Sequence, residues 1–271
     1  MIITSITPYV YEYDLPNPIS DARNTITKRS CLLVKVKTDE GLVGWGEAAS
    51  FANCGSLVAD VIRFLEDRFV GQDPRFISRL YDTQYHLTQH FGRRGLVINA
   101  LSGIDVALWD LQGKRAGLPV YQLLGASRDK IAFYFNSGYF IEGDHHAFLE
   151  RTIEQSVERG AGAIKIKIGR HGFADDVWRV KRAREILGPE RDLMVDANAC
   201  LPARYLQRLD DVLSEHGVRW LEEPIPLQNR SVLIELRNKL RTPIAGYELE
   251  MTLLGYHQLL KDRVTHRHHG A

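Results

Sequence analysis

Three acidic residues recur at equal intervals in the second half of the chain. Asp196, Glu222 and Glu248 each follow a short apolar segment, and each lies 26 residues from the next. If those segments are neighbouring strands of a (β/α) barrel, the three carboxylates lie side by side on its C-terminal rim, where barrel active sites form. Converging carboxylates repel one another unless a cation neutralises them, and an all-oxygen ligand set suits Mg²⁺. The spacing therefore predicts a magnesium site, with solvated loop positions as the alternative.

Two lysines lie on the preceding apolar segment, in the sequence Lys165-Ile166-Lys167. Because side chains alternate between the two faces of a strand, both lysines share one face. A carboxylate substrate held by Mg²⁺ has an acidified α-proton, because the metal stabilises the enediolate that remains. A neutral lysine then takes that proton, and the like charge of the second lysine lowers the pKa of the base. The pattern indicates metal-assisted proton abstraction; the alternative is an ordinary polar face of an edge strand.

The order of elements after about residue 130 predicts a parallel sheet that positions these residues. Short apolar strands alternate with amphipathic helices at a steady spacing, which is typical of βαβ units. The strands are expected at residues 131–136, 163–168, 193–196, 220–222 and 244–245. The helices are expected at about residues 145–159, 173–187, 203–216 and 229–240.

The first part of the chain has a different character. Residues 2–48 are expected to be mostly strands, with a hairpin that turns at Asp39-Glu40-Gly41. Residues 15–29 contain two prolines and are expected to be a loop. Residues 56–117 carry apolar side chains at helical spacing, and strands followed by helices indicate an α+β unit. We therefore expect two domains, residues 1–125 and 126–271.

The composition of the 271-residue chain excludes several function classes. Thirty-five basic and 34 acidic residues give a net charge of +1, which does not favour a polybasic nucleic-acid surface. No run of about 18 apolar residues predicts a membrane span, and the N-terminus lacks the pattern of a signal peptide. The three cysteines are widely spaced and form neither a disulfide framework nor a metal knuckle, so we expect a cytoplasmic protein.

Several motifs along the chain share a family pattern. They are Gly44-Trp45-Gly46-Glu47, Ile104-Asp105 and Ala107-Leu108-Trp109-Asp110 within residues 100–117, Lys165-Ile166-Lys167, Val195-Asp196-Ala197-Asn198, Trp220-Leu221-Glu222-Glu223-Pro224, and Pro243-Ile244-Ala245-Gly246-Tyr247-Glu248. On these motifs the chain resembles the mandelate racemase/muconate lactonizing enzyme family of the enolase superfamily, up to about residue 262. The resemblance implies an α+β capping domain followed by a (β/α) TIM-type barrel.

The resemblance also implies roles for the charged residues. Asp196, Glu222 and Glu248 would be the Mg²⁺ ligands. Lys167 would be the base on one face of the substrate, and Lys165 would assist it and contact the substrate carboxylate. The substrate class is therefore a small carboxylate molecule.

Specificity in the family comes from residues around this centre. Asn198 would line the site, and the loops near residues 16–28 and 50–55 would close over the substrate. A glutamate as third ligand is typical of the mandelate racemase branch, in which acid-sugar dehydratases are common. The resemblance therefore implies a Mg²⁺-dependent lyase, with racemisation less favoured.

The chain departs from the family at its C-terminal end. Only about five of the eight barrel strands are present, and residues 263–271 are basic and histidine-rich, as expected of a truncation or a shifted reading frame. The later strands of the family supply the acid/base group for the opposite face of the substrate, and no residue here is assigned to it. The alternative function is a catalytically inactive homologue that retains metal binding or self-association. Because an incomplete barrel exposes two strand edges and its apolar interior, we expect a homo-oligomer or a poorly folding chain.

Some histidines and one cysteine allow simpler interpretations. His86 and His90 share a helix face but lack the glutamate of a metalloprotease, so a solvated face is favoured. His145 and His146 are interpreted as a loop and helix start, with a substrate contact as the alternative. The histidines after residue 265 are expected to lie in a disordered tail, with metal scavenging as the alternative. Cys200 has no evident histidine partner and is interpreted as structural.

Overall fold

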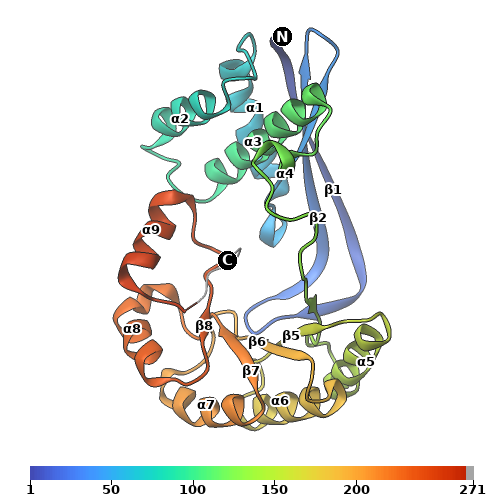
Figure 1. Ribbon diagram of the computed structural model, residues 1–271, viewed down its shortest axis with the longest axis vertical. Helices are drawn as coiled ribbons and strands as arrows, with labels where there is room; N and C mark the ends of the chain where they lie inside the picture. The colour runs from blue at the N-terminus through green and yellow to red at the C-terminus, as the bar shows by residue number, and fades with distance from the viewer. Residues whose placement is uncertain (267–271) are drawn as a thin grey trace. The chain divides into compact units, whose positions relative to one another are not determined.

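The computed structural model describes residues 1–266, which form two compact units (Figure 1). The first unit contains Met1–Leu15 and Lys28–Ile131. The second contains Pro16–Thr27 and the described residues from Ala132 onward. Within this described part, every helix is too short or too polar to cross a membrane.

A three-stranded sheet forms the N-terminal part of the chain. Its strands are β1 (Ile3–Ser20), β2 (Thr25–Thr38) and β3 (Val43–Ala48), in that spatial order. Strands β2 and β3 are antiparallel, with Leu32 opposite Ala48, which confirms the predicted hairpin.

Residues 15–29 do not form the loop that their prolines predicted. Strands β1 and β2 run through this segment and are joined by a short turn. In that turn the Asp21 carboxylate accepts hydrogen bonds from the backbone N–H groups of Arg23 and Asn24, both at 2.7 Å. The two prolines lie in β1, an edge strand, where a proline is tolerated because no neighbouring strand loses a hydrogen bond.

Helices complete the first unit. They are η1 (Phe51–Asn53), α1 (Gly55–Phe69), α2 (Ile77–Thr88), α3 (Leu96–Ala116) and α4 (Val120–Leu123). Helix α3 lies directly against β3 because glycines remove the side chains at their contact. A Cβ atom on Gly46 would overlap the carbonyl oxygen of Gly103, and one on Gly44 would overlap that of Ala107. The Gly44-Trp45-Gly46 motif is thus a packing surface for α3.

A parallel five-stranded sheet, in the order β4-β5-β6-β7-β8, forms the centre of the second unit. The strands are β4 (Phe135–Asn136), β5 (Ala163–Lys167), β6 (Asp192–Asp196), β7 (Val218–Glu222) and β8 (Ile244–Ala245). The helices are α5 (His145–Glu158), α6 (Phe173–Leu187), η2 (Ala203–Tyr205), α7 (Leu206–Glu215), η3 (Leu227–Asn229), α8 (Arg230–Lys239) and α9 (Thr252–Asp262). The predicted α+β unit followed by an incomplete (β/α) barrel is therefore confirmed.

The first predicted strand of this sheet is shorter than expected. It was placed at residues 131–136, but only Phe135–Asn136 pairs with β5. Ile131 and Phe133 are 79% and 70% exposed, so their apolar pattern belongs to the surface rather than to a sheet core.

One apolar core holds the sheet against its helices. Figure 1 shows α5, α6, α7 and α8 along one side of the sheet, and Ile164 and Ile166 of β5 are fully buried in the core shared with these helices. Because side chains alternate along a strand, Lys165 and Lys167 point to the opposite face.

The outer edge of β8 is partly covered by the chain that follows α9. The backbone N–H of His266 donates to the carbonyl oxygen of Ile244 at 2.9 Å, and the N–H of Ile244 donates to His266 Nδ1 at 3.1 Å. Val264 beside them is fully buried. The expected bare edge at β8 is therefore corrected within the described residues. The rest of the histidine-rich tail, residues 267–271, lies outside them.

Candidate functional site

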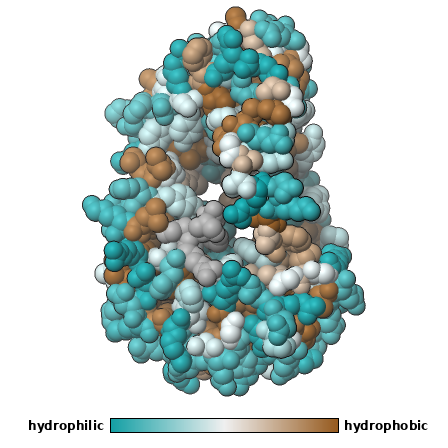
Figure 2. Space-filling view, in the orientation of Figure 1, coloured by the Kyte–Doolittle hydropathy of each residue, from teal (hydrophilic) through white to brown (hydrophobic). Residues whose placement is uncertain are grey.

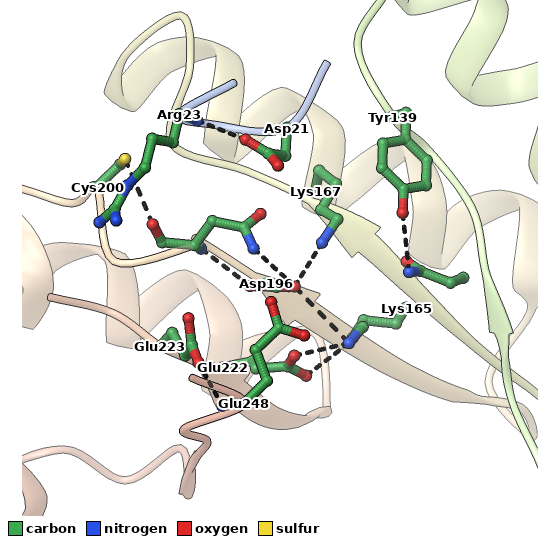
Figure 3. Close-up of polar contacts among 12 residues, drawn as sticks. Asp21, Arg23, Tyr139, Lys165, Lys167, Asp196, Cys200, Glu222, Glu223 and Glu248 are labelled. Atoms are coloured by element: carbon green, nitrogen blue, oxygen red, sulfur yellow. Dashed lines mark hydrogen bonds and ion pairs between the residues drawn. The ribbon is translucent and has the colours of Figure 1, made fainter. Parts of the chain in front are cut away.

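The ends of the parallel strands bring the predicted site residues together. Lys167, Asp196 and Glu222 are the last residues of β5, β6 and β7, and the sheet register places Asp196 opposite both of the others. Glu248 follows β8 by three residues. Since all these strands run in the same direction, their side chains meet at one edge of the sheet (Figure 3).

Two lysine–carboxylate ion pairs form the centre of this edge. Lys167 Nζ donates to Asp196 Oδ2 at 2.5 Å. Lys165 Nζ donates to both carboxylate oxygens of Glu222, at 2.7 and 2.8 Å, and lies 3.7 Å from Asp196 Oδ2. All four residues are at most 5% exposed, so the pairs are shielded from water.

Burial and opposite charge together determine the protonation of the lysines. Burial opposes a charged Lys165, but the charges of Glu222 and Asp196 outweigh it and raise its pKa. Burial likewise opposes a charged Lys167, but Asp196 raises its pKa. Lys165 lowers the pKa of Lys167 only weakly. The prediction that the like charge of Lys165 leaves Lys167 with a lowered pKa is therefore wrong for this arrangement. Both lysines are ammonium ions here, and either becomes a base only when its carboxylate partner is engaged elsewhere.

The third acidic residue and its neighbour lie at the next position along the edge. Figure 3 shows the Glu248 carboxylate pointing towards those of Asp196 and Glu222. The backbone N–H of Glu248 donates to Glu223 Oε1 at 2.7 Å, which holds the segment after β8 in place. Burial raises the pKa of Glu223 to about 7. The sequence did not predict that Glu223 would hold the segment after β8, although the Glu222-Glu223 doublet was the available signal.

Asn198 supports Asp196 from the turn that follows β6. Its backbone N–H donates to Asp196 Oδ1 at 2.9 Å, and its side-chain amide donates to Oδ2 at 3.4 Å. Its own Oδ1 is buried and has no hydrogen-bond partner among the described residues. An unpaired buried acceptor beside the ion pairs is open to a donor from a bound molecule.

Aromatic rings complete the surroundings of the lysines, and sequence analysis missed them. Lys165 Nζ lies 5.3 Å from the ring centre of Tyr134, and Lys167 Nζ lies 5.3 Å from that of Tyr139. The indole N–H of Trp220 donates to Glu222 Oε2 at 3.3 Å. Rings over a cation favour its charged form. The two tyrosine contacts leave no spacing signal, because Tyr134 and Tyr139 come from a different segment from the lysines.

One of the two predicted substrate loops lies beside the site within the second unit. Arg170 Nη1 donates to the carbonyl oxygen of Asp21 at 2.9 Å, and Arg23 Nη2 donates to that of Ala199 at 3.5 Å. The tip of the β1–β2 hairpin is therefore fastened to the segments after β5 and β6. The other predicted loop, residues 50–55, belongs to the first unit, where it forms η1 and the start of α1.

The donor set of the site suits a hard divalent cation. Asp196, Glu222 and Glu248 offer only carboxylate oxygens, as Mg²⁺ prefers. The oxygens of these carboxylates lie farther apart than the ligand atoms of a single bound ion, because the Lys165 ammonium lies between Asp196 and Glu222. The residues fit Mg²⁺ on condition that the carboxylates exchange their lysine partners for the metal.

Two family models match the chain. The model for the N-terminal domain of mandelate racemase / muconate lactonizing enzyme matches residues 5–125. The model described as enolase C-terminal domain-like matches residues 149–266.

Curated relatives and solved structures share this similarity. The chain is 32% identical over 229 residues to arabinonate dehydratase of Saccharolobus solfataricus, which covers 84% of this chain and 61% of that protein. It is 32% identical over 255 residues to L-talarate/galactarate dehydratase of Salmonella typhimurium, covering 91% and 63%. A crystal structure of the Salmonella enzyme liganded with Mg and L-lyxarohydroxamate matches with a TM-score of 0.90 at 30% identity, covering 97% of this chain and 69% of that chain. The chain thus spans less than two thirds of the length of these curated relatives.

Proposed function

We propose, from the premise that this chain belongs to the mandelate racemase / muconate lactonizing enzyme family, that it abstracts the α-proton of a hydroxy-carboxylate in a Mg²⁺-dependent, acid-sugar dehydratase-like reaction. The observation that carries the proposal is the pair of buried lysines facing acidic residues on successive parallel strands. Relatives named as acid-sugar dehydratases, and their structures with Mg and acid-sugar ligands, support it.

Asp196, Glu222 and Glu248 are the proposed metal ligands. When bound, Mg²⁺ would supply positive charge that stabilises the enediolate oxygens of the intermediate. Engagement of Asp196 away from Lys167 would remove the carboxylate that keeps this lysine charged, and so would lower its pKa towards that of a useful base.

Lys167 is the proposed base and Lys165 the proposed contact for the substrate carboxylate. Lys167 Nζ accepts the α-proton, and the electron pair of the broken C–H bond becomes the enediolate. Asn198 Oδ1, buried and unpaired in this arrangement, is the proposed acceptor for a substrate hydroxyl. The hairpin tip carrying Asp21 and Arg23 is the proposed specificity element, because it is anchored next to Asn198.

A second candidate is a catalytically inactive homologue that binds Mg²⁺ or self-associates. It is favoured by the five-strand sheet, in which no described residue is assigned as the acid/base group on the opposite face of the substrate. Racemisation needs a group on each face of the substrate, so among the described residues it is less favoured than proton abstraction from one face.

Deuterium incorporation at the α-carbon of a panel of acid sugars, with Mg²⁺ in D₂O, distinguishes the two candidates. We expect exchange in the wild type and its loss in Lys167→Ala, because that substitution removes the proposed base. Lys181→Ala removes an exposed lysine of α6 and is the matched control, which should exchange like the wild type. Absence of exchange across the panel in the wild type supports the inactive homologue instead.

The metal site is tested separately by calorimetric titration with Mg²⁺. Replacing all three acids, as Asp196→Asn, Glu222→Gln and Glu248→Gln, should abolish binding while the protein still shows the far-UV circular dichroism of the wild type. Retained Mg²⁺ affinity in that folded triple variant would refute this ligand set under both candidates.

A further inference from the structure

A second cluster of metal-binding side chains lies away from the strand ends, between two neighbouring helices. His145 and His146 begin α5, and Asp175 lies in the first turn of α6. One ligand atom from each of the three residues lies within 4.8 Å of the other two. His145 Nε2 is 3.0 Å and His146 Nε2 is 2.6 Å from the same oxygen, Asp175 Oδ1.

The rings are held in position by stacking. His146 stacks on the indole of Trp178, with ring centres 3.7 Å apart, and His145 stacks on His171 at 4.4 Å. The α5 end is itself ordered, because the Asp144 carboxylate accepts a hydrogen bond from the N–H of Ala147 at 2.9 Å. Two imidazole nitrogens and a carboxylate oxygen therefore converge without any rearrangement of the backbone.

Hydrogen bonding within the cluster leaves part of it unsatisfied. Both imidazoles donate to Asp175 Oδ1, while Asp175 Oδ2 is buried and has no hydrogen-bond partner among the described residues. A buried carboxylate oxygen without a partner is costly, and a cation bridging the carboxylate and the imidazoles would satisfy it. The N-terminal ends of α5 and α6 carry partial positive charge that opposes a bound cation, and the Asp175 carboxylate offsets it. A ligating Nε2 would pass its proton to Nδ1 of the same ring or to water.

We propose that His145, His146 and Asp175 form a second metal site, specific for a borderline transition-metal ion such as Zn²⁺, that links α5 to α6. Two imidazoles with one carboxylate favour Zn²⁺, Co²⁺ or Ni²⁺ over Mg²⁺, which prefers oxygen ligands. The partly exposed His146 gives the ion a path from solvent and leaves room for a water ligand. This site is independent of the proposed reaction, since its ligands are separate from Asp196, Glu222 and Glu248.

The test is a calorimetric titration with Zn²⁺ in excess Mg²⁺, which keeps the all-oxygen site filled. The parent protein carries His268→Ala and His269→Ala, so that the last two histidines of the chain do not contribute. We expect one Zn²⁺ per chain, and an affinity at least about tenfold weaker in each of His145→Ala, His146→Ala and Asp175→Asn. The matched control, called the α2 control, is His86→Ala/His90→Ala, which removes one histidine of α2 and one from the turn that follows it and should leave the affinity unchanged.

Two further measurements separate loss of the site from loss of the fold. Zn²⁺ should raise the Tm of the parent and of the α2 control, but not that of His146→Ala, whose metal-free Tm shows that it is folded. In the unsubstituted chain, Zn²⁺ should shift the imidazole ¹⁵N resonances of His145 and His146. Unchanged affinity in all three site variants, or resonance shifts confined to other histidines, would overturn the proposal.

Discussion

At the scale of single residues, the main feature of the candidate site is a set of charged side chains buried away from water. Lys165, Lys167, Asp196 and Glu222 are shielded from water, so each depends on its neighbours for compensation. Removing one member of a buried pair leaves an uncompensated charge, which costs far more than an exposed pair contributes. The site is therefore both a chemical centre and a place of high energetic sensitivity.

Glu222→Gln should destabilise the metal-free protein by about 3–5 kcal/mol. The buried Lys165 ammonium would lose the negative carboxylate to which it donates two short hydrogen bonds. Urea unfolding at neutral pH measures the change. Glu235→Gln is the control, since Glu235 pairs with Lys239 on an exposed face of α8, and it should change the free energy of unfolding far less than Glu222→Gln does. Equal costs for the two substitutions would contradict the importance of the buried pair.

At the scale of elements, close packing depends on the absence of side chains. Gly44 and Gly46 bring β3 against α3, whose Gly103 provides space on the other side. The buried side of α3 is almost entirely apolar. The contact with β3 therefore fixes the position of this helix.

Gly46→Ala should destabilise the first unit by about 1–3 kcal/mol, because the new methyl group meets a helix carbonyl oxygen that cannot move alone. Thermal unfolding of purified protein provides the comparison. Gly162→Ala is the matched control, because a Cβ atom there meets open space and should change the Tm little. If Gly46→Ala and Gly162→Ala both have the Tm of the wild type, the close contact between β3 and α3 does not limit the stability of the first unit.

The turn before α2 should contribute to acid sensitivity. The side chain and the backbone N–H of Arg75 donate hydrogen bonds to the Asp73 carboxylate and lower its pKa to about 2. A carboxyl group with a lowered folded-state pKa contributes stability above its ordinary value near 4, and this contribution is lost as the pH falls towards about 2.

Asp73→Asn should therefore have a lower Tm than the wild type at neutral pH, and the difference should shrink between about pH 4 and pH 2. Tm values measured across this range test the sign. A constant difference at every pH would show that the carboxylate charge is not what stabilises the turn.

At the scale of the whole molecule, exposed apolar surface predicts association. Leu253 and Leu254 on α9 are 86% and 69% exposed, and Leu249 before the helix is 57% exposed. Figure 2 shows apolar residues over α9 at the left of the view. Exposed apolar side chains of this kind are typical of an interaction site or of a liability to aggregate, and the expected self-association of the chain would bury them.

Leu253→Gln/Leu254→Gln should shift the protein towards the monomer in sedimentation velocity, because the largest exposed apolar side chains of α9 are gone. Leu57→Gln changes a leucine that is 55% exposed in the first unit and should leave the sedimentation profile unaltered. A wild type that sediments as a single monomer and melts cooperatively would refute self-association.

Patterns that repeat along the chain could be predicted from the sequence. The equal spacing of Asp196, Glu222 and Glu248 and the Lys165-Ile166-Lys167 alternation identified the strand ends and the face of the site. Strand β8 and helix α6 were predicted at their observed bounds, because period and flanking residues are local properties. The hairpin tip was missed, because prolines in an edge strand look the same in a sequence as prolines in a loop.

Only the tertiary structure decided four features of this protein. They are the charge state of the lysines, the rings above them, the orientation of Glu223, and the convergence of His145, His146 and Asp175. Sequence periodicity places a residue on a face, but it carries no information on which side chain from another segment lies within a few ångströms of it. Ion pairing and desolvation depend on those distances. The sequence by itself therefore determined which residues share an edge of the sheet, while the tertiary structure determined which of them form ion pairs.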